Sequence, residues 1–395
     1  MSVRDRLTEL SEIAEKRLPK PESFSQRLRG SVVTARIGRW LAVSFGICFL
    51  TGLISHFVQH PLAGPWRWPT GPVWLYRVTQ GVHITSGVAS IPLLAVKLWS
   101  VAPRFWRRPL FGGLLDGLER LSILVLIAAA GFQLLTGLLN VAEVYAWDFY
   151  FPNAHFAVAF VAVGAIILPI AVKLPVIRTA LGEPVEQALV PTEDSLPAKP
   201  RGLTRRGVLG IAAAGVGIGV LTTVGDKLHF LSPVSVFAQR RGSGPQGLPV
   251  NQTAAATGVT KKASSTSWKL VVAGAAKTVS LSRADLQALP QRRVRLPIAC
   301  VEGWSVNADW EGVPLSALLA LAEQEPVEVR MMSMERSIYG TSMVSAQLAA
   351  DPDTLVALKL NGEELDLDHG FPARLIAPNR PGAMQTKWLG RIEVA

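Results

Sequence analysis

The sequence predicts an α-helical transmembrane bundle, with four helices plus one anchor helix, followed by a soluble mixed α+β domain. Of its 395 residues, 49% are hydrophobic and only 17% are charged, which is less charge than soluble domains usually carry. The apolar residues form long runs before residue 226, whereas the remainder has the composition of ordinary globular sequence. We therefore expect a membrane part followed by a soluble part. In the soluble part, short β-like runs predict strands at 268–273, 294–300, 327–333, 355–360 and 374–377, and one helix is expected at 315–323.

Five apolar stretches are long enough to cross a bilayer core: 38–58, 78–100, 119–142, 154–176 and 207–225. Aromatic residues between them are typical of an interfacial belt: Trp66, Trp68, Trp74, Tyr76, Tyr145, Trp147 and Tyr150. The predicted parts of the chain are a cytoplasmic segment 1–37, a four-helix membrane domain 38–180, a Pro-rich cytoplasmic linker 181–206, a fifth transmembrane helix 207–226, an extended tether 227–265 and a soluble domain 266–395.

The basic residues predict the orientation of this bundle. The net charge is +11, but Lys and Arg gather between apolar stretches, as they do on the cytoplasmic side of membrane proteins, so we expect no nucleic-acid partner. They follow the second and fourth stretches: Arg104, Arg107, Arg108, Arg178, Lys199, Arg201, Arg205 and Arg206. The N-terminus is then cytoplasmic and 227–395 lies outside the cytoplasm. No apolar core opens the chain, so we expect no cleaved signal peptide.

Thr204–Leu209 precedes the fifth stretch and contains the pair Arg205-Arg206. It resembles a twin-arginine signal, an address read by an export receptor, here at an internal position. The alternative is that the pair contributes only two more positive charges on the cytoplasmic side.

The two cysteines, Cys48 and Cys300, lie in the membrane part and the soluble part respectively, so a disulfide between them is not expected. No close set of Cys and His predicts a zinc site, and no CxxCH motif predicts covalent haem.

Two blocks of the soluble part carry the strongest signal. The first is Leu296–Ser305, which contains Cys300-Val301-Glu302-Gly303-Trp304-Ser305 and is followed by Trp310–Leu315. The second combines Asn361–Glu363, Asp368–Leu375 and Lys387-Trp388. Both resemble the molybdopterin-binding domain of the sulfite oxidase superfamily, and the first is similar to its periplasmic methionine sulfoxide reductase branch. The resemblance covers most of 266–395 and implies a sulfite-oxidase-type fold.

This resemblance implies that Cys300 is the thiolate ligand of molybdenum. A soft thiolate suits such a metal, and the metal's charge keeps it deprotonated. The alternative is a buried structural cysteine. The resemblance also implies that Arg374 and Lys387 contact the phosphate-bearing pterin, with His369 beside them and Arg380 as a further candidate. His369 is equally consistent with a turn residue. We interpret Trp304 and Trp388 as core or pocket wall, and residues 331–337 as candidate substrate-pocket lining without a supporting motif.

Three of the six histidines, His56, His83 and His155, lie at similar depth near the predicted outer ends of helices. A b-type haem needs two axial histidines from different helices. The region resembles the membrane cytochrome b subunits of formate dehydrogenases and hydrogenases. Such cytochromes often carry a second haem toward the cytoplasm, but here the inner halves of the helices hold no histidine, and Pro169 occupies the position expected for a further ligand. We therefore expect at most one haem, ligated by His83 and His155, with His56 as the substitute. The alternative is that these histidines only hydrogen-bond at the membrane interface.

Together these features predict an oxidoreductase that exchanges electrons between the quinone pool, through the haem, and an oxygen-atom-transfer substrate outside the cytoplasm. By resemblance, the substrate is an S-oxide or N-oxide, free or protein-bound, such as methionine sulfoxide. The reverse direction, oxidation of a sulfite-like donor, is one alternative. A non-catalytic electron-transfer or docking subunit is the other.

Overall fold

The computed structural model describes residues 28–61, 67–105, 114–142, 144, 147, 151–185, 203–224, 233–238 and 244–395. The backbone divides into two compact units, one of Met1–Gly52 with Val82–Ala238 and one of Leu53–Gly81 with Gln239–Ala395. Most of the predicted segment 1–37 and of the linker 181–206 lies outside the described residues, as do Trp66, Arg107, Arg108, Tyr145, Tyr150, Lys199 and Arg201.

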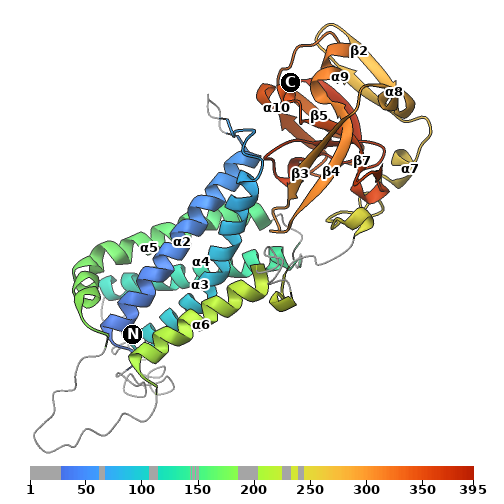
Figure 1. Cartoon of the computed structure of the whole chain (residues 1–395). Helices are drawn as coiled ribbons and strands as arrows, with labels where there is room; N and C mark the ends of the chain where they lie inside the picture. Colours follow the sequence, from blue (N-terminus) through green and yellow to red (C-terminus); the bar gives the residue numbers. More distant parts are fainter. Residues whose placement is uncertain are drawn as a thin grey trace, which may run out of the picture. The chain divides into compact units, whose positions relative to one another are not determined.

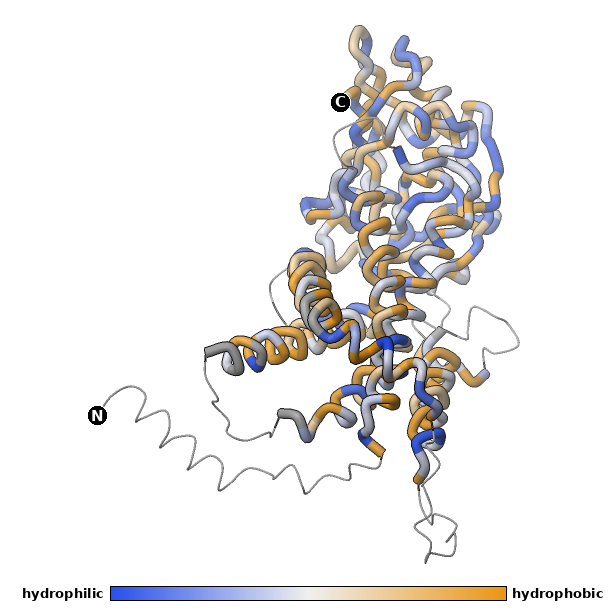
Figure 2. Tube along the Cα trace, turned by 90° about the vertical axis from the view of Figure 1, so that its left-hand side faces the viewer, coloured by the Kyte–Doolittle hydropathy of each residue, from blue (hydrophilic) through white to orange (hydrophobic). Residues whose placement is uncertain are grey.

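Each predicted apolar stretch coincides with one long helix (Figure 1). The helices are α2 (Ser31–Gln59), α3 (Leu75–Phe105), α4 (Leu114–Val141), α5 (Phe151–Gly182) and α6 (Arg205–Val224). Backbone hydrogen bonding continues beyond most of the apolar limits, so most helix ends extend into polar flanks. By length and composition, four described helical segments could cross a membrane: Ser31–Gln59, Leu75–Pro103, Arg120–Val141 and Arg205–Thr223. In α5 the described apolar segment is shorter, Pro152–Ile167. Figure 2 shows hydrophobic colour dominating these helices.

The first unit has a small core in which three helices meet. Buried Ile37 of α2, Leu93 of α3 and Val208 of α6 share one cluster. The hydroxyl of Thr204 accepts a hydrogen bond from the backbone N–H of Gly207 at 3.0 Å, as N-terminal capping residues do. This contact fixes the start of α6 at the arginine pair.

The C-terminal domain contains two five-stranded sheets, so the predicted mixed α+β class is confirmed. The first has the order β2-β1-β10-β5-β6, formed by Thr278–Ser282, Lys269–Ala273, Leu389–Val394, Val329–Ser333 and Thr341–Val344. The second has the order β3-β4-β7-β8, with β9 also pairing with β7, formed by Arg292–Ala299, Ser305–Pro314, Leu355–Leu360, Glu363–Glu364 and Arg374–Ile376. Three short helices accompany them: α8 (Arg283–Ala288), α9 (Leu315–Leu321) and α10 (Ala346–Ala350).

Strand β7 separates two hydrophobic cores. Successive side chains of a strand point to opposite faces. Val356 and Leu358 therefore join the core between the two sheets, which also contains α9. Leu355 and Ala357 join the other core, which contains Cys300 and residues of β3 and β4. Burial on both faces explains why the first four residues of β7, Leu355–Leu358, are all apolar.

The strands predicted at 268–273, 294–300, 327–333, 355–360 and 374–377 coincide with β1, β3, β5, β7 and β9, and the helix predicted at 315–323 with α9. The predicted extended tether 227–265 is wrong over 244–265. That stretch contains a 3₁₀ turn at Pro245–Gly247 and the short helix α7 at Thr260–Ala263. Its Ala254, Val259 and Ala263 form a buried cluster with Trp388. Small side chains filling space against a distant tryptophan are a tertiary effect that composition does not reveal.

Candidate functional site

Cys300 follows β3, in a tight turn that leads into β4. Its backbone N–H donates to the carbonyl oxygen of Trp304 at 2.9 Å, and the N–H of Gly303 donates to the carbonyl oxygen of Cys300 at 3.0 Å. Gly303 has φ +100, a conformation that favours glycine. The turn thus sets the sulfur-bearing residue, which is 2% exposed, at the wall of a pocket.

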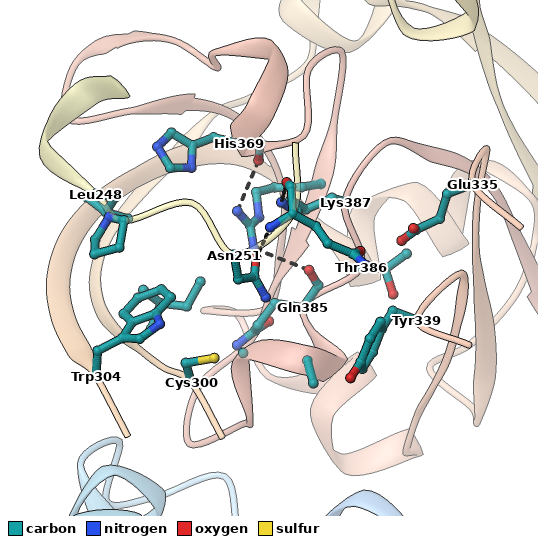
Figure 3. A pocket seen from close by; sticks show the side chains of 16 residues that line it. Leu248, Asn251, Cys300, Trp304, Glu335, Tyr339, His369, Gln385, Thr386 and Lys387 are labelled. Carbon is teal, nitrogen blue, oxygen red and sulfur yellow. Dashed lines mark hydrogen bonds between the residues drawn. The ribbon is translucent and has the colours of Figure 1, made fainter. Parts of the chain in front are cut away.

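The pocket encloses about 600 Å³, including space open to solvent. It is lined by Leu248, Pro249, Asn251, Gln252, Ile298, Cys300, Trp304, Glu335, Tyr339, His369, Arg374, Gly382, Ala383, Gln385, Thr386 and Lys387. Figure 3 shows Cys300 and Trp304 on one side, Glu335 and Tyr339 on the opposite side, and Lys387 between them. Four sequence-predicted residues, Cys300, His369, Arg374 and Lys387, therefore meet in one pocket.

Gly370 makes it possible for the His369 loop to approach β9 closely. It has φ +107, and a Cβ atom there would lie 3.1 Å from the Cβ atoms of both Arg374 and Lys387. Glycine is consequently required for both reasons, backbone conformation and space. The loop brings three of the predicted side chains together from positions up to 18 residues apart.

His369 presents a neutral imidazole to the pocket. Its Nε2 lies 2.7 Å from the carbonyl oxygen of Pro245, and because a carbonyl only accepts, Nε2 carries the proton. Burial, followed by the positive charge of Arg374, lowers the pKa of His369 to about 4. At neutral pH the remaining nitrogen, Nδ1, is therefore a hydrogen-bond acceptor.

Arg374 is a buried cation with an unused donor. Its Nη1 donates to the carbonyl oxygen of His369 at 3.0 Å, and its Nη2 to that of Gln385 at 3.2 Å. Its guanidinium lies 5.1 Å from the ring centre of Trp310. Its Nε has no hydrogen-bond partner among the described residues. Burial lowers its pKa to about 9, so it remains charged at neutral pH.

Lys387 is anchored by two backbone carbonyls. Its Nζ donates to the oxygen of Gln252 at 2.6 Å and to that of Asp368 at 2.9 Å. Burial, followed by the charge of Arg374, lowers its pKa to about 7. A neutral amine supplies two N–H groups, enough for these carbonyls, so the third donor exists only in the protonated form.

Arg380 does not line the pocket. It is 4% exposed and donates from Nη2 to the carbonyl oxygen of Met343. Its Nε and Nη1 have no hydrogen-bond partner among the described residues, and burial lowers its pKa to about 9. The residues that follow it pack on the Cys300 turn, since a Cβ atom at Gly382 would lie 3.1 Å from the carbonyl oxygen of Ala299.

Sequence reasoning missed much of the lining. Of residues 331–337, Glu335 faces the pocket; its Oε2 accepts from the hydroxyl of Ser337 at 3.0 Å, and burial raises its pKa. Asn251 and Gln252 lie in the stretch predicted as a tether. No local pattern marks these residues, because their role depends on which loops the fold brings together.

In the first unit, the rings of His83 and His155 are neighbours, with centres 6.5 Å apart and planes inclined at 72°. The Nδ1 of His83 lies 2.8 Å from the carbonyl oxygen of Cys48, to which it must donate. The Nδ1 of His155 lies 2.8 Å from the hydroxyl of Thr136, which itself donates to Phe132 at 2.7 Å. Each neutral imidazole then keeps Nε2 as its lone-pair atom.

His56 lies in the other unit. Its ring centre is 4.8 Å from that of His60 and 5.5 Å from that of Phe57. Of the three predicted histidines, the structure therefore pairs His83 with His155.

Comparison with known proteins gives the C-terminal domain relatives. Residues 256–395 match the family described as the oxidoreductase molybdopterin binding domain. Mitochondrial sulfite oxidase of Drosophila melanogaster is 33% identical over 156 residues, which cover 32% of this chain and 27% of that protein. Human mitochondrial sulfite oxidase is 31% identical, and the match covers 32% of this chain and 29% of the human protein. Nitrate reductase [NADPH] of Phytophthora infestans is 41% identical over 96 residues, which cover 22% of this chain and 11% of that protein.

The chain thus spans less than a third of the length of each of these three relatives. Among solved structures, the sulfane dehydrogenase SoxCD of Paracoccus pantotrophus aligns with 32% of this chain and 38% of its own, with 26% identity and a TM-score of 0.31.

The pocket's side chains fit a molybdopterin. Two buried cationic side chains, one with an unused Nε donor, suit a phosphate-bearing group. The single buried sulfur of Cys300 suits a soft metal.

Proposed function

We propose that this chain, whose residues 256–395 are a molybdopterin-binding oxidoreductase domain of the sulfite oxidase type, is a membrane-bound molybdenum oxidoreductase. It exchanges electrons between the quinone pool, through a b-type haem, and an oxygen-atom-transfer substrate outside the cytoplasm. The observation that carries the proposal is the convergence of Cys300, His369, Arg374 and Lys387 on one pocket of that domain.

In this proposal Cys300 holds the molybdenum, and the cofactor supplies two-electron oxygen-atom chemistry when bound. Arg374 and Lys387 hold the phosphate and anionic edge of the pterin, and the Nδ1 atom of His369 accepts a hydrogen bond from it. Trp304 forms an apolar wall beside the sulfur and limits access of water. Arg380, outside the lining, braces the loop behind Cys300 rather than touching the ligand.

The preferred reaction is reduction of an S-oxide or N-oxide. An S-oxide takes up two electrons and two protons and yields a sulfide and water. A quinol supplies both electrons and, on becoming a quinone, releases two protons. Glu335, on the side opposite Cys300, and Lys387, between the two sides, are groups able to hold protons near the substrate (Figure 3). Methionine sulfoxide is the first substrate to test.

The reverse direction is the second candidate. A sulfite-like donor takes up an oxygen atom from water and releases two electrons and two protons, which reduce a quinone. The similar proteins include sulfite oxidases and a nitrate reductase. Their names therefore cover both oxidation of a donor and reduction of an oxide. A non-catalytic docking subunit is the third candidate, and the retained Cys300 argues against it.

The geometry of His83 and His155 supports the haem. Metal–imidazole bonds are about 2 Å long, so two imidazoles on opposite sides of one iron have ring centres roughly 6 Å apart, close to the 6.5 Å observed. Hydrogen bonds at Nδ1, which orient a metal-binding imidazole, exist for both rings. The alternative, histidines that only hydrogen-bond, does not require two rings on different helices to lie at this separation.

Four apolar helical segments of sufficient length and the distribution of Lys and Arg support a membrane location with a cytoplasmic N-terminus. The Arg205-Arg206 pair at the start of α6 supports export of the C-terminal domain by the twin-arginine route. Protease accessibility of that domain in cells carrying Arg205→Lys/Arg206→Lys tests this point, with Arg178→Lys as control. Unchanged accessibility in the double variant contradicts twin-arginine export.

The decisive experiment is a visible difference spectrum of the purified full chain, with molybdenum content measured in parallel. We expect b-type bands on reduction by a quinol and their loss on addition of methionine sulfoxide. Haem that stays reduced contradicts this substrate and favours another oxide or the oxidative direction. We expect near-stoichiometric molybdenum in the wild type and loss of the metal in Cys300→Ala. Cys48→Ala is the control and should keep the metal. Full metal content in Cys300→Ala contradicts the ligand assignment.

A further inference from the structure

The backbone after Cys300 is bound by a residue of the predicted membrane part. Gln80, in the second unit and 6% exposed, lies in the early turns of α3. Its Nε2 donates to the carbonyl oxygen of Val301 at 2.8 Å. A buried glutamine amide therefore fixes the residue directly after the cysteine.

The backbone before Cys300 contacts the same helix start. Tyr76, 1% exposed, packs with Val58 and Ala299 in one small buried cluster. The hydroxyls of Tyr76 and Ser55 lie 2.9 Å apart, which holds the tyrosine in place. Both neighbours of Cys300 in the chain are thus contacted from the segment 53–81.

Asn379 makes three hydrogen bonds to this segment. Its Oδ1 accepts from the backbone N–H of Tyr76 at 2.7 Å, and its Nδ2 donates to the carbonyl oxygen of Pro69 at 2.7 Å. Its own carbonyl oxygen accepts from Nε1 of Trp68 at 2.8 Å. Asn379 is 2% exposed and has φ +50, a conformation that asparagine tolerates better than most residues.

The loop that begins at Asn379 presses on the Cys300 turn. Pro381 forms an isolated parallel bridge with Ala299. A Cβ atom at Gly382 would lie 3.5 Å from the Cα atom of Cys300, so the two loops are in direct contact. A shift of Asn379 is consequently passed to the cysteine through packed backbone.

We propose that Trp68–Gln80 is a positioning element for the molybdenum pocket, acting through Gln80 on Val301 and through Asn379 on the loop 379–382. The segment 68–80, which belongs to the same compact unit as the C-terminal domain, then sets the geometry of the Cys300 turn. Gln80 and Asn379 are positioning residues, since they act through Val301 and Gly382. The link to molybdenum rests on the proposed role of Cys300.

Hydrogen–deuterium exchange of the full-length purified chain tests this inference. The test can be read whether or not the preparation contains metal. Gln80→Met keeps the length and helix propensity of the side chain but removes the donor to Val301. We expect exchange of the Cys300 and Gly303 amides to rise about fivefold, the factor that corresponds to one lost hydrogen bond. Exchange in β5 stays unchanged. Gln291→Met is the control, because that amide donates to the backbone carbonyl oxygens of Leu286 and Leu289 and takes no part in the contacts around Cys300.

Asn379→Asp provides a second, independent variant. It keeps the acceptor for Tyr76 but replaces the donor to Pro69 by an oxygen, and we expect faster exchange in the same turn. Asn361→Asp is its control: Asn361 has φ +52, its Oδ1 accepts from Asp309 at 3.0 Å, and its Nδ2 donates to Gln246 at 2.9 Å. The control loses an equivalent donor elsewhere in the domain.

Faster exchange at Cys300 and Gly303 in both test variants, but in neither control, supports the positioning element. Wild-type exchange in both test variants overturns it. An equal rise in Asn361→Asp also overturns it, because the effect would then be general loosening. Molybdenum content of the same preparations separates the two proposals: a wild type without metal rejects the role of Cys300, while the exchange comparison still decides the positioning role.

Discussion

The Nη1 atom of Arg374 donates to the carbonyl oxygen of His369 at 3.0 Å, and this contact ties the pocket's buried cation to its neutral imidazole. The positive guanidinium contributes to the low pKa of His369, about 4, after burial itself. In the proposed site, Arg374 would supply charge and an N–H donor, and His369 would supply a lone pair.

Replacing Arg374 by Lys tests the importance of that geometry. Lysine keeps the charge but lacks the planar fork that bonds two carbonyls while offering Nε. We expect the molybdopterin content of the purified chain to fall roughly tenfold or more, as when partners that orient a metal site are lost. Arg330→Lys, at an exposed ion pair with Glu393, should retain wild-type content. Equal cofactor content in the two variants would refute the role of Arg374.

We expect cofactor binding to depend on the protonation of Lys387. Its pKa of about 7 means that the charge and third donor disappear as pH rises through neutrality. We expect the affinity of the cofactor-free chain for molybdopterin to decline between roughly pH 6 and 8, and the decline to be absent in Lys387→Met. Binding titrations across this range measure it, and a wild-type curve parallel to that of Lys387→Met contradicts it.

The same lysine has the opposite effect on folding. Its pKa in the folded chain lies below the ordinary lysine value of 10.5, so the unfolded chain binds more protons between about pH 7 and 10.5. The penalty for burying the charge is therefore complete below pH 7 and disappears as pH rises to 10.5. The cofactor-free domain should gain stability across this window, and Lys387→Met should gain less in denaturant titrations. An identical pH dependence in both would contradict this assignment.

Gly370 and Gly362 provide a matched comparison of backbone strain and space. Both have positive φ, +107 and +87, but only at Gly370 does a Cβ meet neighbours, at 3.1 Å from Arg374 and Lys387. Gly362→Ala should cost about 1 kcal/mol of unfolding free energy. Gly370→Ala should cost more, about 2–4 kcal/mol, because strain and overpacking both act. Thermal unfolding measures both losses of stability. A larger loss in Gly362→Ala than in Gly370→Ala would show that the His369 loop accommodates the extra Cβ atom.

Thr136 offers a graded test of the haem. We expect His83→Ala and His155→Ala to remove the b-type bands, and His56→Ala to keep them. Thr136→Val keeps the shape but removes the acceptor for Nδ1 of His155, so haem should be retained with a changed midpoint potential. A potential identical to the wild type would mean that Thr136 does not orient an iron ligand. Loss of the bands in His56→Ala alone would reassign the ligand.

Much of the architecture was predictable because its causes are local. Apolar runs gave all five long helices, and β-rich runs gave β1, β3, β5, β7 and β9. The strands that were missed, such as β2 and β10, carry alternating polar residues and owe their existence to pairing with β1 and β5. Strand β4 was hidden because its Ser305–Pro314 stretch contains glycine and charged residues within the motif region.

The sequence by itself determined the residue types at the site: one cysteine in the soluble domain, a His-Gly-Phe-Pro-Ala-Arg run that ends at Arg374, and Lys387 further along the chain. Short motifs hold such information because the glycine at 370 and the turn after Cys300 are local requirements. Tertiary structure alone decided that Glu335, Asn251 and Gln252 line the pocket, that Arg380 does not, and that Asn379 binds Trp68 and Pro69. These contacts join positions as much as 311 residues apart, and long-range packing of that kind leaves no periodic trace along the chain.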